Sequence, residues 1–185
     1  MSNLPPSLFA KVANRGAPTV EFIKELIKWG RGEADGVFEP NSRYDIYSIV
    51  KPVLGPWKST AHRRAVMCEV LRVLAGFESS WKQNEDKDVA NPAENSPETW
   101  SAGPFQISAN SMNLAPELKA FAKKELGVCD PNNFRRAMMS DWQFAMAYTA
   151  RLLRINTNHN GPVKRKEILP WLKEDAVDAF MKELA

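Results

Sequence analysis

The longest apolar stretch of the chain starts at Ala61 and leads toward a glutamate. From Ala65 to Phe77 it reads AVMCEVLRVLAGF, in which Glu69 and Arg72 are the only charged residues. A helix that is apolar on almost every side is usually packed among other helices at the centre of a domain. The pattern therefore predicts a central buried helix, and the spacing of Glu69 and Arg72 predicts an ion pair along it.

One apolar row of this helix ends on a carboxylate. Met67, Leu71 and Leu74 follow the four-three spacing of one helix face, and the next member of the row is a glutamate, Glu78. A carboxylate among apolar side chains is costly when it is ionised, so its pKa is expected to rise. Glu78 is therefore the candidate for acid chemistry; the alternative is an ordinary helix-end glutamate that reaches solvent.

Helical periodicity, caps and breaks predict further helices along the rest of the chain. They are expected at residues 19–30, 44–50, 116–126, 140–152 and 170–184, with another helical turn or two beginning at residue 131. The predicted N-terminal caps are Thr19, Ser59 or Thr60, and Ser140, and Gly127 is a predicted terminator.

The overall pattern favours one helical domain. No strand alternation, internal repeat or low-complexity tract is visible in the sequence. We therefore expect an all-α or mostly α fold, with room for a small hairpin near residues 80–107. A chain of 185 residues fits a single domain, and residues 1–17 are expected to form a loosely held arm.

The composition of the chain limits the classes of partner and cofactor that we expect. The chain has 25 Lys and Arg against 22 Asp and Glu, a net charge of +3, without the basic clustering of a dedicated DNA-binding protein. No apolar run has the length of a membrane span. Two histidines and the separated Cys68 and Cys129 form no metal-ligand pattern, and two free thiols are expected. We therefore expect no nucleic-acid partner, no membrane insertion, no metal and no cofactor.

Two motifs flank the polar segment that follows the central helix. GFESSW (76–81) ends the apolar stretch, and an Asn-, Asp- and Pro-rich run closes on SAGPFQIS (101–108). The pair resembles the signature of the goose-type lysozyme and lytic transglycosylase superfamily, in which Glu-Ser at the end of a central helix precedes a Gly-x-x-Gln turn. Glu78-Ser79 and residues 103–106 occupy those places, so the resemblance implies a lysozyme-like helical domain in which Glu78 is the catalytic acid/base.

A third patch follows in the same order. In the superfamily a later helix carries a conserved tyrosine pattern, and a Tyr-Asn-Ala-Gly-Pro segment then lies beside the catalytic glutamate. Here Tyr148 fits the first pattern and NHNGP (158–162) resembles the second. The segment between the two patches is shorter than usual, NHNGP has no tyrosine, and Pro104-Phe105 replaces the usual Leu-Met. The resemblance covers residues 61–162.

The resemblance also implies a set of substrate-binding residues. Ser79 and Gln106 are expected to hold Glu78 or the substrate. The other groove candidates are Trp81, Ser101, Gly103, Phe105, Tyr148, His159 and Asn160. For the aromatic residues a place in the core, and for the glycine and asparagine a place in a turn, are the alternative interpretations.

A second carboxylate distinguishes two reaction types. A glycoside hydrolase that uses two carboxylates needs them about 5 to 9 Å apart. The loop offers Glu85, Asp86, Asp88, Glu94 and Glu98. Glu98 lies five residues before Gly103, near the position of the superfamily's second acid, and is the candidate. A lytic transglycosylase needs no second carboxylate, because a hydroxyl of the substrate itself attacks.

The sequence thus predicts a monomeric glycosidase that binds peptidoglycan strands and cleaves the β-1,4 bond between N-acetylmuramic acid and N-acetylglucosamine. The first residues lack the order of a signal peptide. Synthesis in the bacterial cytoplasm is therefore expected, followed by action on the cell wall after release as a phage endolysin or after injection as an antibacterial effector, which would need an inhibitor protein. A chitinase and a non-catalytic glycan-binding or phage structural protein are the alternatives.

Overall fold

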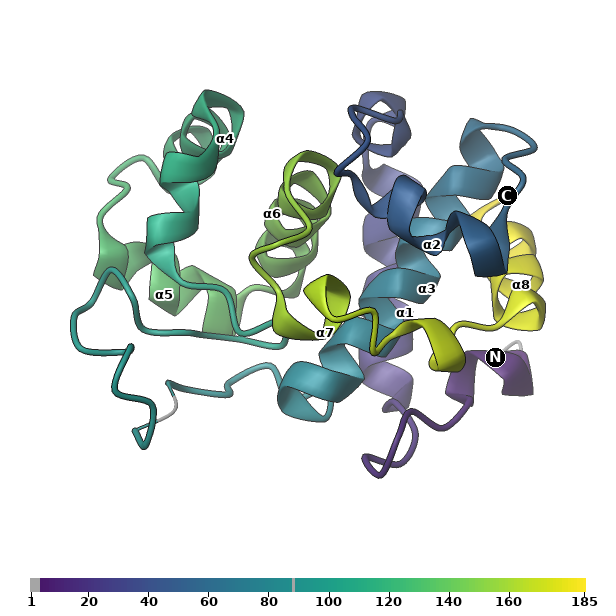
Figure 1. Cartoon of the computed structure of the whole chain (residues 1–185), viewed down its shortest axis with the longest axis horizontal. Coiled ribbons are helices and arrows are strands. Elements are labelled where there is room, and N and C mark those ends of the chain that lie inside the picture. The colour runs from purple at the N-terminus through teal and green to yellow at the C-terminus, as the bar shows by residue number, and fades with distance from the viewer. Residues whose placement is uncertain (1–3, 88) are drawn as a thin grey trace.

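The computed structural model describes residues 4–87 and 89–185, and these residues form helices joined by turns and loops, without a strand (Figure 1). The prediction of an all-α fold is confirmed. The helices are η1 (Pro6–Phe9), α1 (Val20–Gly32), η2 (Asp35–Phe38), α2 (Ile46–Leu54), α3 (Thr60–Ser79), η3 (Ala109–Leu114), α4 (Pro116–Leu126), α5 (Pro131–Ser140), α6 (Trp142–Ile155), α7 (Gly161–Lys164), η4 (Leu169–Trp171) and α8 (Glu174–Leu184).

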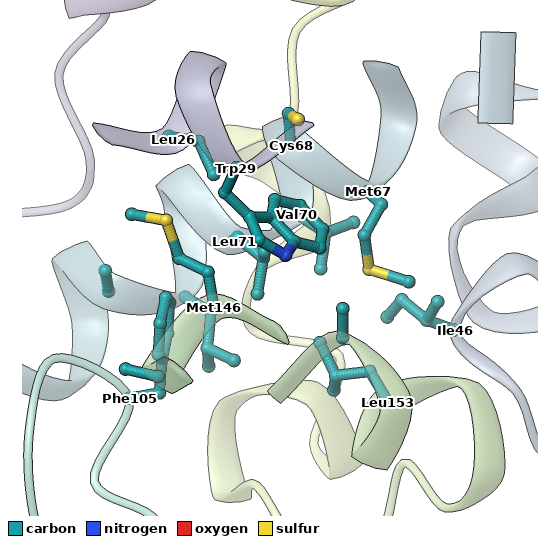
Figure 2. Close-up of a cluster of buried hydrophobic side chains, with 14 of the residues drawn as sticks. Leu26, Trp29, Ile46, Met67, Cys68, Val70, Leu71, Phe105, Met146 and Leu153 are labelled. Carbon is teal, nitrogen blue, oxygen red and sulfur yellow. The ribbon is translucent and has the colours of Figure 1, made fainter. Parts of the chain in front are cut away.

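The central helix is α3. It packs against α1, α6 and α8, and Figure 1 shows α6 and α8 on its two sides. Its residues from Ala65 to Gly76 are all buried. In the core, Val70 and Leu71 lie among Trp29 of α1 and Met146 of α6 (Figure 2). The predicted central buried helix is therefore present, and its packing on several sides explains its nearly uniform apolar sequence.

The end of α3 turns the chain sharply into the polar loop. Ser80 has a left-handed backbone with φ of 54°, and the Trp81 amide donates to the Ala75 carbonyl at 3.1 Å. This closure satisfies carbonyls of the last helical turn that have no partner within the helix. Glu78 therefore sits on the final turn of a rigid, buried helix, where its position is fixed by the core.

The predicted ion pair of α3 is fully buried and joins three segments. Arg72 Nε lies 2.7 Å from Glu69 Oε2, and neither side chain is exposed. Arg72 Nη1 also donates to the Ala10 carbonyl at 2.7 Å, and the Lys173 amide donates to Glu69 at 2.9 Å. The pair thus connects the N-terminal segment and the start of α8 to the central helix.

The N-terminal segment is not a loose arm where the structure describes it. Leu8 and Val12 are completely buried in the core, and Val12 packs against Gly76 of α3. The prediction for residues 1–17 is therefore wrong for residues 4–13, because two apolar side chains without a helical pattern still bury in the core, whereas residues 14–17 are exposed. Residues 1–3 of that predicted arm lie outside the described residues.

The hairpin predicted near residues 80–107 is also wrong. The described part of this segment forms turns, because its backbone groups bond to side chains and to nearby turns. An example is Glu94, whose carboxylate accepts from the Ser101 amide at 3.0 Å. The loop is therefore shaped by side-chain contacts that no strand periodicity reports.

Several predicted caps and terminators are confirmed, and other helix ends differ from the prediction. Thr19 and Ser59 cap α1 and α3, and Gly127 ends α4. α2 continues through Pro52 to Leu54, and the last helix begins at Glu174 rather than at Pro170. The cap of α6 is Asp141, whose carboxylate accepts from two backbone amides, whereas the Ser140 hydroxyl donates back to the Arg136 carbonyl. Cys68 and Cys129 are free thiols, as expected.

None of the described helices combines the length and the apolar character that crossing a membrane requires.

Candidate functional site

A groove of about 620 Å³ opens at the C-terminal end of α3. Its lining comes from four parts of the chain: the end of α3, the loop that follows it, the start of α7 and the N-terminal segment. With two exceptions, the lining residues carry polar or charged side chains. The lining residues are Arg15, Glu78, Ser79, Ser80, Lys82, Glu85, Asp86, Lys87, Val89, Asn91, Glu94, Ser101, Gln106, His159, Asn160 and Gly161.

Glu78 is the half-buried acid of this groove. Burial disfavours its charged form and raises its pKa to about 7, against the ordinary value of 4.5. A hydrogen bond from Asn160 and the charge of Arg165 lower the pKa, and Glu167 raises it, but burial is the larger effect. Near neutral pH a large share of the molecules therefore carries a proton on Glu78, as the apolar row of α3 predicts.

Ser79 and Gly103 hold the turn that faces Glu78. The Ser79 hydroxyl donates to the Pro104 carbonyl at 2.9 Å and connects α3 to the turn. Gly103 has φ of +72°, and a Cβ there would lie 2.2 Å from the Met138 carbonyl oxygen of α5. Only glycine fits this close approach without displacing the turn. Ser79 also lines the groove, whereas the predicted groove residue Gly103 is not among the lining residues.

Gln106 lines the groove and closes the same turn. Its side-chain amide donates to the Gly103 carbonyl at 3.1 Å and points toward the Glu85 carbonyl at 3.4 Å. The Gly103 amide in turn donates to the Glu85 carbonyl at 2.8 Å. The predicted Gly-x-x-Gln turn is therefore a compact unit that fastens one wall of the groove.

The start of α7 completes the environment of Glu78. Asn160 is almost fully buried, its amide nitrogen donates to the Phe105 carbonyl at 3.4 Å, and its Oδ1 has no partner among the described residues. His159 also lines the groove, and burial lowers its pKa, so its imidazole is neutral at pH 7. The structure thus brings the Glu78-Ser79, 103–106 and 159–160 motifs together in space.

Three predicted groove residues lie in the core instead. Trp81 is buried, and its indole Nε1 donates to the Arg72 carbonyl at 2.8 Å. Phe105 is fully buried beside Met146 (Figure 2). Tyr148 is fully buried as well, with its hydroxyl 2.7 Å from the Ser111 hydroxyl. The predictions for Trp81, Phe105 and Tyr148 are wrong, because these aromatic side chains bury more surface in the core than a polar groove offers.

Glu98, the predicted second carboxylate, does not reach the groove. Its side chain is exposed and is absent from the groove lining. The Asn110 amide donates to its backbone carbonyl at 2.9 Å, which turns this stretch toward η3. Asp88, another acid considered from the sequence, lies outside the described residues.

The described carboxylates that line the groove besides Glu78 each have a partner. Glu85 pairs with Lys82 at 3.2 Å. Asp86 pairs with Arg135 of α5, and the hydrogen bond from that guanidinium lowers the pKa of Asp86. Glu94 accepts from the Ser101 hydroxyl at 2.9 Å, so the predicted groove residue Ser101 mainly fixes this acid. Glu78 is thus the acid of the described groove whose environment favours its protonated form.

Sequence reasoning missed several lining residues. Arg15, Lys82, Lys87 and Asn91 lie in turns and loops, where no periodic pattern indicates the direction of a side chain. Arg165 and Glu167, whose charges act on Glu78, follow α7 and were also missed. Their effect depends on how the chain folds back to α3, which no local motif reports.

No family model, curated protein or solved structure matches this chain. The chemistry of the site is therefore argued from its geometry. A carboxyl that holds its proton near neutral pH can deliver that proton to a bound oxygen atom and later take one back. A groove lined by hydroxyl, amide and charged groups suits a ligand rich in hydrogen-bonding groups.

Proposed function

We propose that the protein cleaves the β-1,4 bond between N-acetylmuramic acid and N-acetylglucosamine in peptidoglycan, with Glu78 as the general acid and base. The observation that carries this proposal is the pKa of about 7 at Glu78 within a large polar groove. Cleavage of a glycosidic bond requires a protonated carboxyl next to the leaving oxygen. The resemblance of the surrounding motifs to lytic transglycosylases and goose-type lysozymes supports the same reaction.

The reaction runs in two proton transfers. Glu78 first gives its proton to the glycosidic oxygen as the bond to the anomeric carbon breaks. The resulting carboxylate then takes a proton from the hydroxyl that attacks this carbon. In a lytic transglycosylase that hydroxyl belongs to the sugar, and its attack leaves a 1,6-anhydro product. In a muramidase water attacks instead, and a second carboxylate takes its proton.

The pairing of the other acids in the groove favours the single-carboxylate form of the reaction. Glu85 and Asp86 pair with Lys82 and Arg135, and Glu94 is held by Ser101. The hydrogen bond from Arg135 lowers the pKa of Asp86, which makes Asp86 a weaker base for activating water. The transglycosylase route needs no such base, because the substrate supplies the attacking hydroxyl.

Asn160 would serve the acid. Its hydrogen bond to Glu78 lowers the pKa of the carboxyl, so it stabilises the carboxylate that forms after proton transfer. Its buried Oδ1 lacks a partner among the described residues, and such an acceptor is costly unless it is satisfied.

Digestion of purified peptidoglycan tests the proposal. We expect the wild-type protein to release muropeptides, seen by mass spectrometry, and Glu78→Gln to release none. Glu98→Gln is the matched control, because this exposed acid lies outside the groove, and it should retain wild-type activity. Products lighter by one water indicate a transglycosylase, and reducing ends indicate a muramidase. Release of muropeptides by Glu78→Gln at the wild-type rate would contradict the proposed role of Glu78.

A further inference from the structure

Arg15 differs from the other cations that line the groove. Lys82 is paired with Glu85, and the Lys87 ammonium lies 3.8 Å from the centre of the Trp100 ring. The Arg15 side chain is exposed, and it forms no hydrogen bond, ion pair or ring contact with any residue in the described part of the chain. The Arg15 guanidinium is thus available to pair with a group of a bound ligand.

The position of Arg15 is fixed by the backbone that carries it. The Arg15 amide donates to the Val12 carbonyl at 3.0 Å, and the Val12 amide donates to the Gly16 carbonyl at 2.9 Å, which closes a tight turn. Val12 is fully buried, and a Cβ at Gly76 would lie 3.1 Å from the Val12 Cβ. The turn is therefore anchored on α3, two residues before Glu78.

The guanidinium of Arg15, which forms no ion pair with the described residues, points to an anionic ligand group. The other acids among the described residues of the groove are engaged by Lys82, Arg135 or Ser101, so none of them neutralises Arg15. A guanidinium has a planar set of donors that matches a carboxylate in two parallel hydrogen bonds. An uncharged glycan such as chitin has no group that uses this feature.

We infer that Arg15 is a specificity residue that binds a carboxylate carried by the glycan substrate. This inference rests on the proposed function, in which the substrate sugar bears a lactyl ether and a peptide stem. The peptide stem carries free carboxylates, the lactyl group carries one only where no stem is attached to it, and either source presents the same chemistry to the guanidinium. Arg15 thereby favours an acidic glycan over chitin, and its charge acts on binding rather than on the proton transfer at Glu78.

Binding measurements test the inference without requiring turnover. The ligands are a peptidoglycan tetrasaccharide with its stems, the same tetrasaccharide after an amidase has removed the stems, and neutral chitotetraose. The parent protein is Glu78→Gln, which is expected to bind without cleaving. Arg15→Met is compared with Lys11→Met in this background, because Lys11 is an exposed cation of the same segment that does not line the groove.

We expect the parent and Lys11→Met to bind at least one acidic glycan about tenfold more tightly than chitotetraose, as one charge-assisted contact allows. Arg15→Met should abolish that preference and leave the affinity for chitotetraose unchanged. Arg15→Lys should restore part of the preference for the acidic glycan, and added salt should reduce that preference. A preference in the parent for the stem-bearing glycan alone assigns the carboxylate to the stem. A preference for the stem-free glycan alone assigns it to the lactyl group, whose carboxylate the amidase exposes, and a preference for both means that Arg15 accepts either carboxylate.

Unchanged preference in Arg15→Met, or an equal loss for all three ligands, would overturn the inference. The reaction is judged separately, by digestion of peptidoglycan with the wild-type chain. If binding showed a preference for acidic glycans that depends on Arg15, but the wild-type chain did not cleave peptidoglycan, the proposed reaction would be contradicted and the carboxylate site would be supported. If the parent bound none of the three ligands, both the proposed reaction and the proposed carboxylate site at Arg15 would be contradicted.

Discussion

The carboxyl group of Glu78 lies between an apolar helix end and a polar groove, and the charges around it act in opposite directions. Burial raises its pKa most, Asn160 and Arg165 lower it, and Glu167 raises it. Arg165 and Glu167 form an ion pair with each other at 2.8 Å, and the Arg165 guanidinium covers Gly161 at the start of α7. The pair thus provides two charges of opposite sign with which the acid can be tuned from outside the groove.

The first prediction concerns the pH dependence of activity. The protonated form of Glu78 is the active acid, so kcat/KM should fall as the pH rises through about 7. Arg165→Met removes a cation that favours the carboxylate, so the pKa and the falling limb should move to higher pH. Glu167→Gln removes an anion that disfavours the carboxylate, so the limb should move to lower pH. Movement of both profiles in the same direction would contradict this electrostatic assignment.

At the scale of single residues, the sequence predicts that Glu78 is an acid with a raised pKa, but not which charged residues adjust that pKa. The row from Met67 to Leu74 predicts that Glu78 continues an apolar face, and the raised pKa agrees with that prediction. Arg165 and Glu167 could not be predicted as its neighbours, because their approach depends on the fold of the chain after α7. The wrong aromatic predictions share this cause: residue type indicates an aromatic contact, but only packing decides whether the ring faces the groove or the core.

At the scale of elements, the groove depends on how the loop after α3 is fastened. The turn at residues 103–106 is held from α3 by Ser79 and rests against α5 through Gly103. The stretch farther along the loop is held by the Asp86–Arg135 ion pair, which also reaches α5. The loop therefore gains its shape from α3 and α5 rather than from internal strand pairing.

The second prediction separates the contact at Gly103 from its backbone conformation. Gly103→Ala should destabilise the fold by about 3 kcal/mol or more, because the new Cβ overlaps the Met138 carbonyl and also strains a positive φ. Gly127→Ala is the matched control, because Gly127 has φ of +69° with open space around it. We expect it to cost roughly 1 to 2 kcal/mol. Equal losses in urea unfolding would contradict the close approach of the turn to α5.

Helices were predictable and the loop was not, for a physical reason. Caps such as Thr19 and Ser59 act on amides three residues away, so their effect is written in the local sequence. The contacts that shape the loop join residues far apart, as Asp86 and Arg135 do. A local pattern carries no information on such contacts, and the predicted hairpin failed for this reason.

At the scale of the whole molecule, the buried pair of Glu69 and Arg72 connects both ends of the chain to its centre. Arg72 bonds the Ala10 carbonyl, and Glu69 accepts the Lys173 amide. Burial raises the pKa of Glu69, while the hydrogen bonds and charge of Arg72 lower it. The N-terminal segment that carries Arg15 is therefore fastened to the same helix that carries Glu78.

The third prediction concerns this pair. Arg72→Met should destabilise the fold by about 3 to 5 kcal/mol, because it leaves the buried Glu69 without its cation. The double variant Glu69→Met/Arg72→Met removes both charges, so it should recover part of the loss. Chemical denaturation of the single and double variants measures the coupling. A double variant that loses the full sum of the two single losses would contradict a mutually dependent pair.

The ionisation of Glu78 itself is the most direct measurement of the central claim. Titration of its side-chain carboxyl by carbon-13 NMR, identified as the signal missing in Glu78→Gln, requires no substrate and no assumption about the reaction. We expect a midpoint near pH 7, which would mean that the acid keeps its proton where the proposed cleavage needs it. A midpoint near the ordinary value of 4.5 would mean that Glu78 is ionised in the groove and would contradict its role as the general acid.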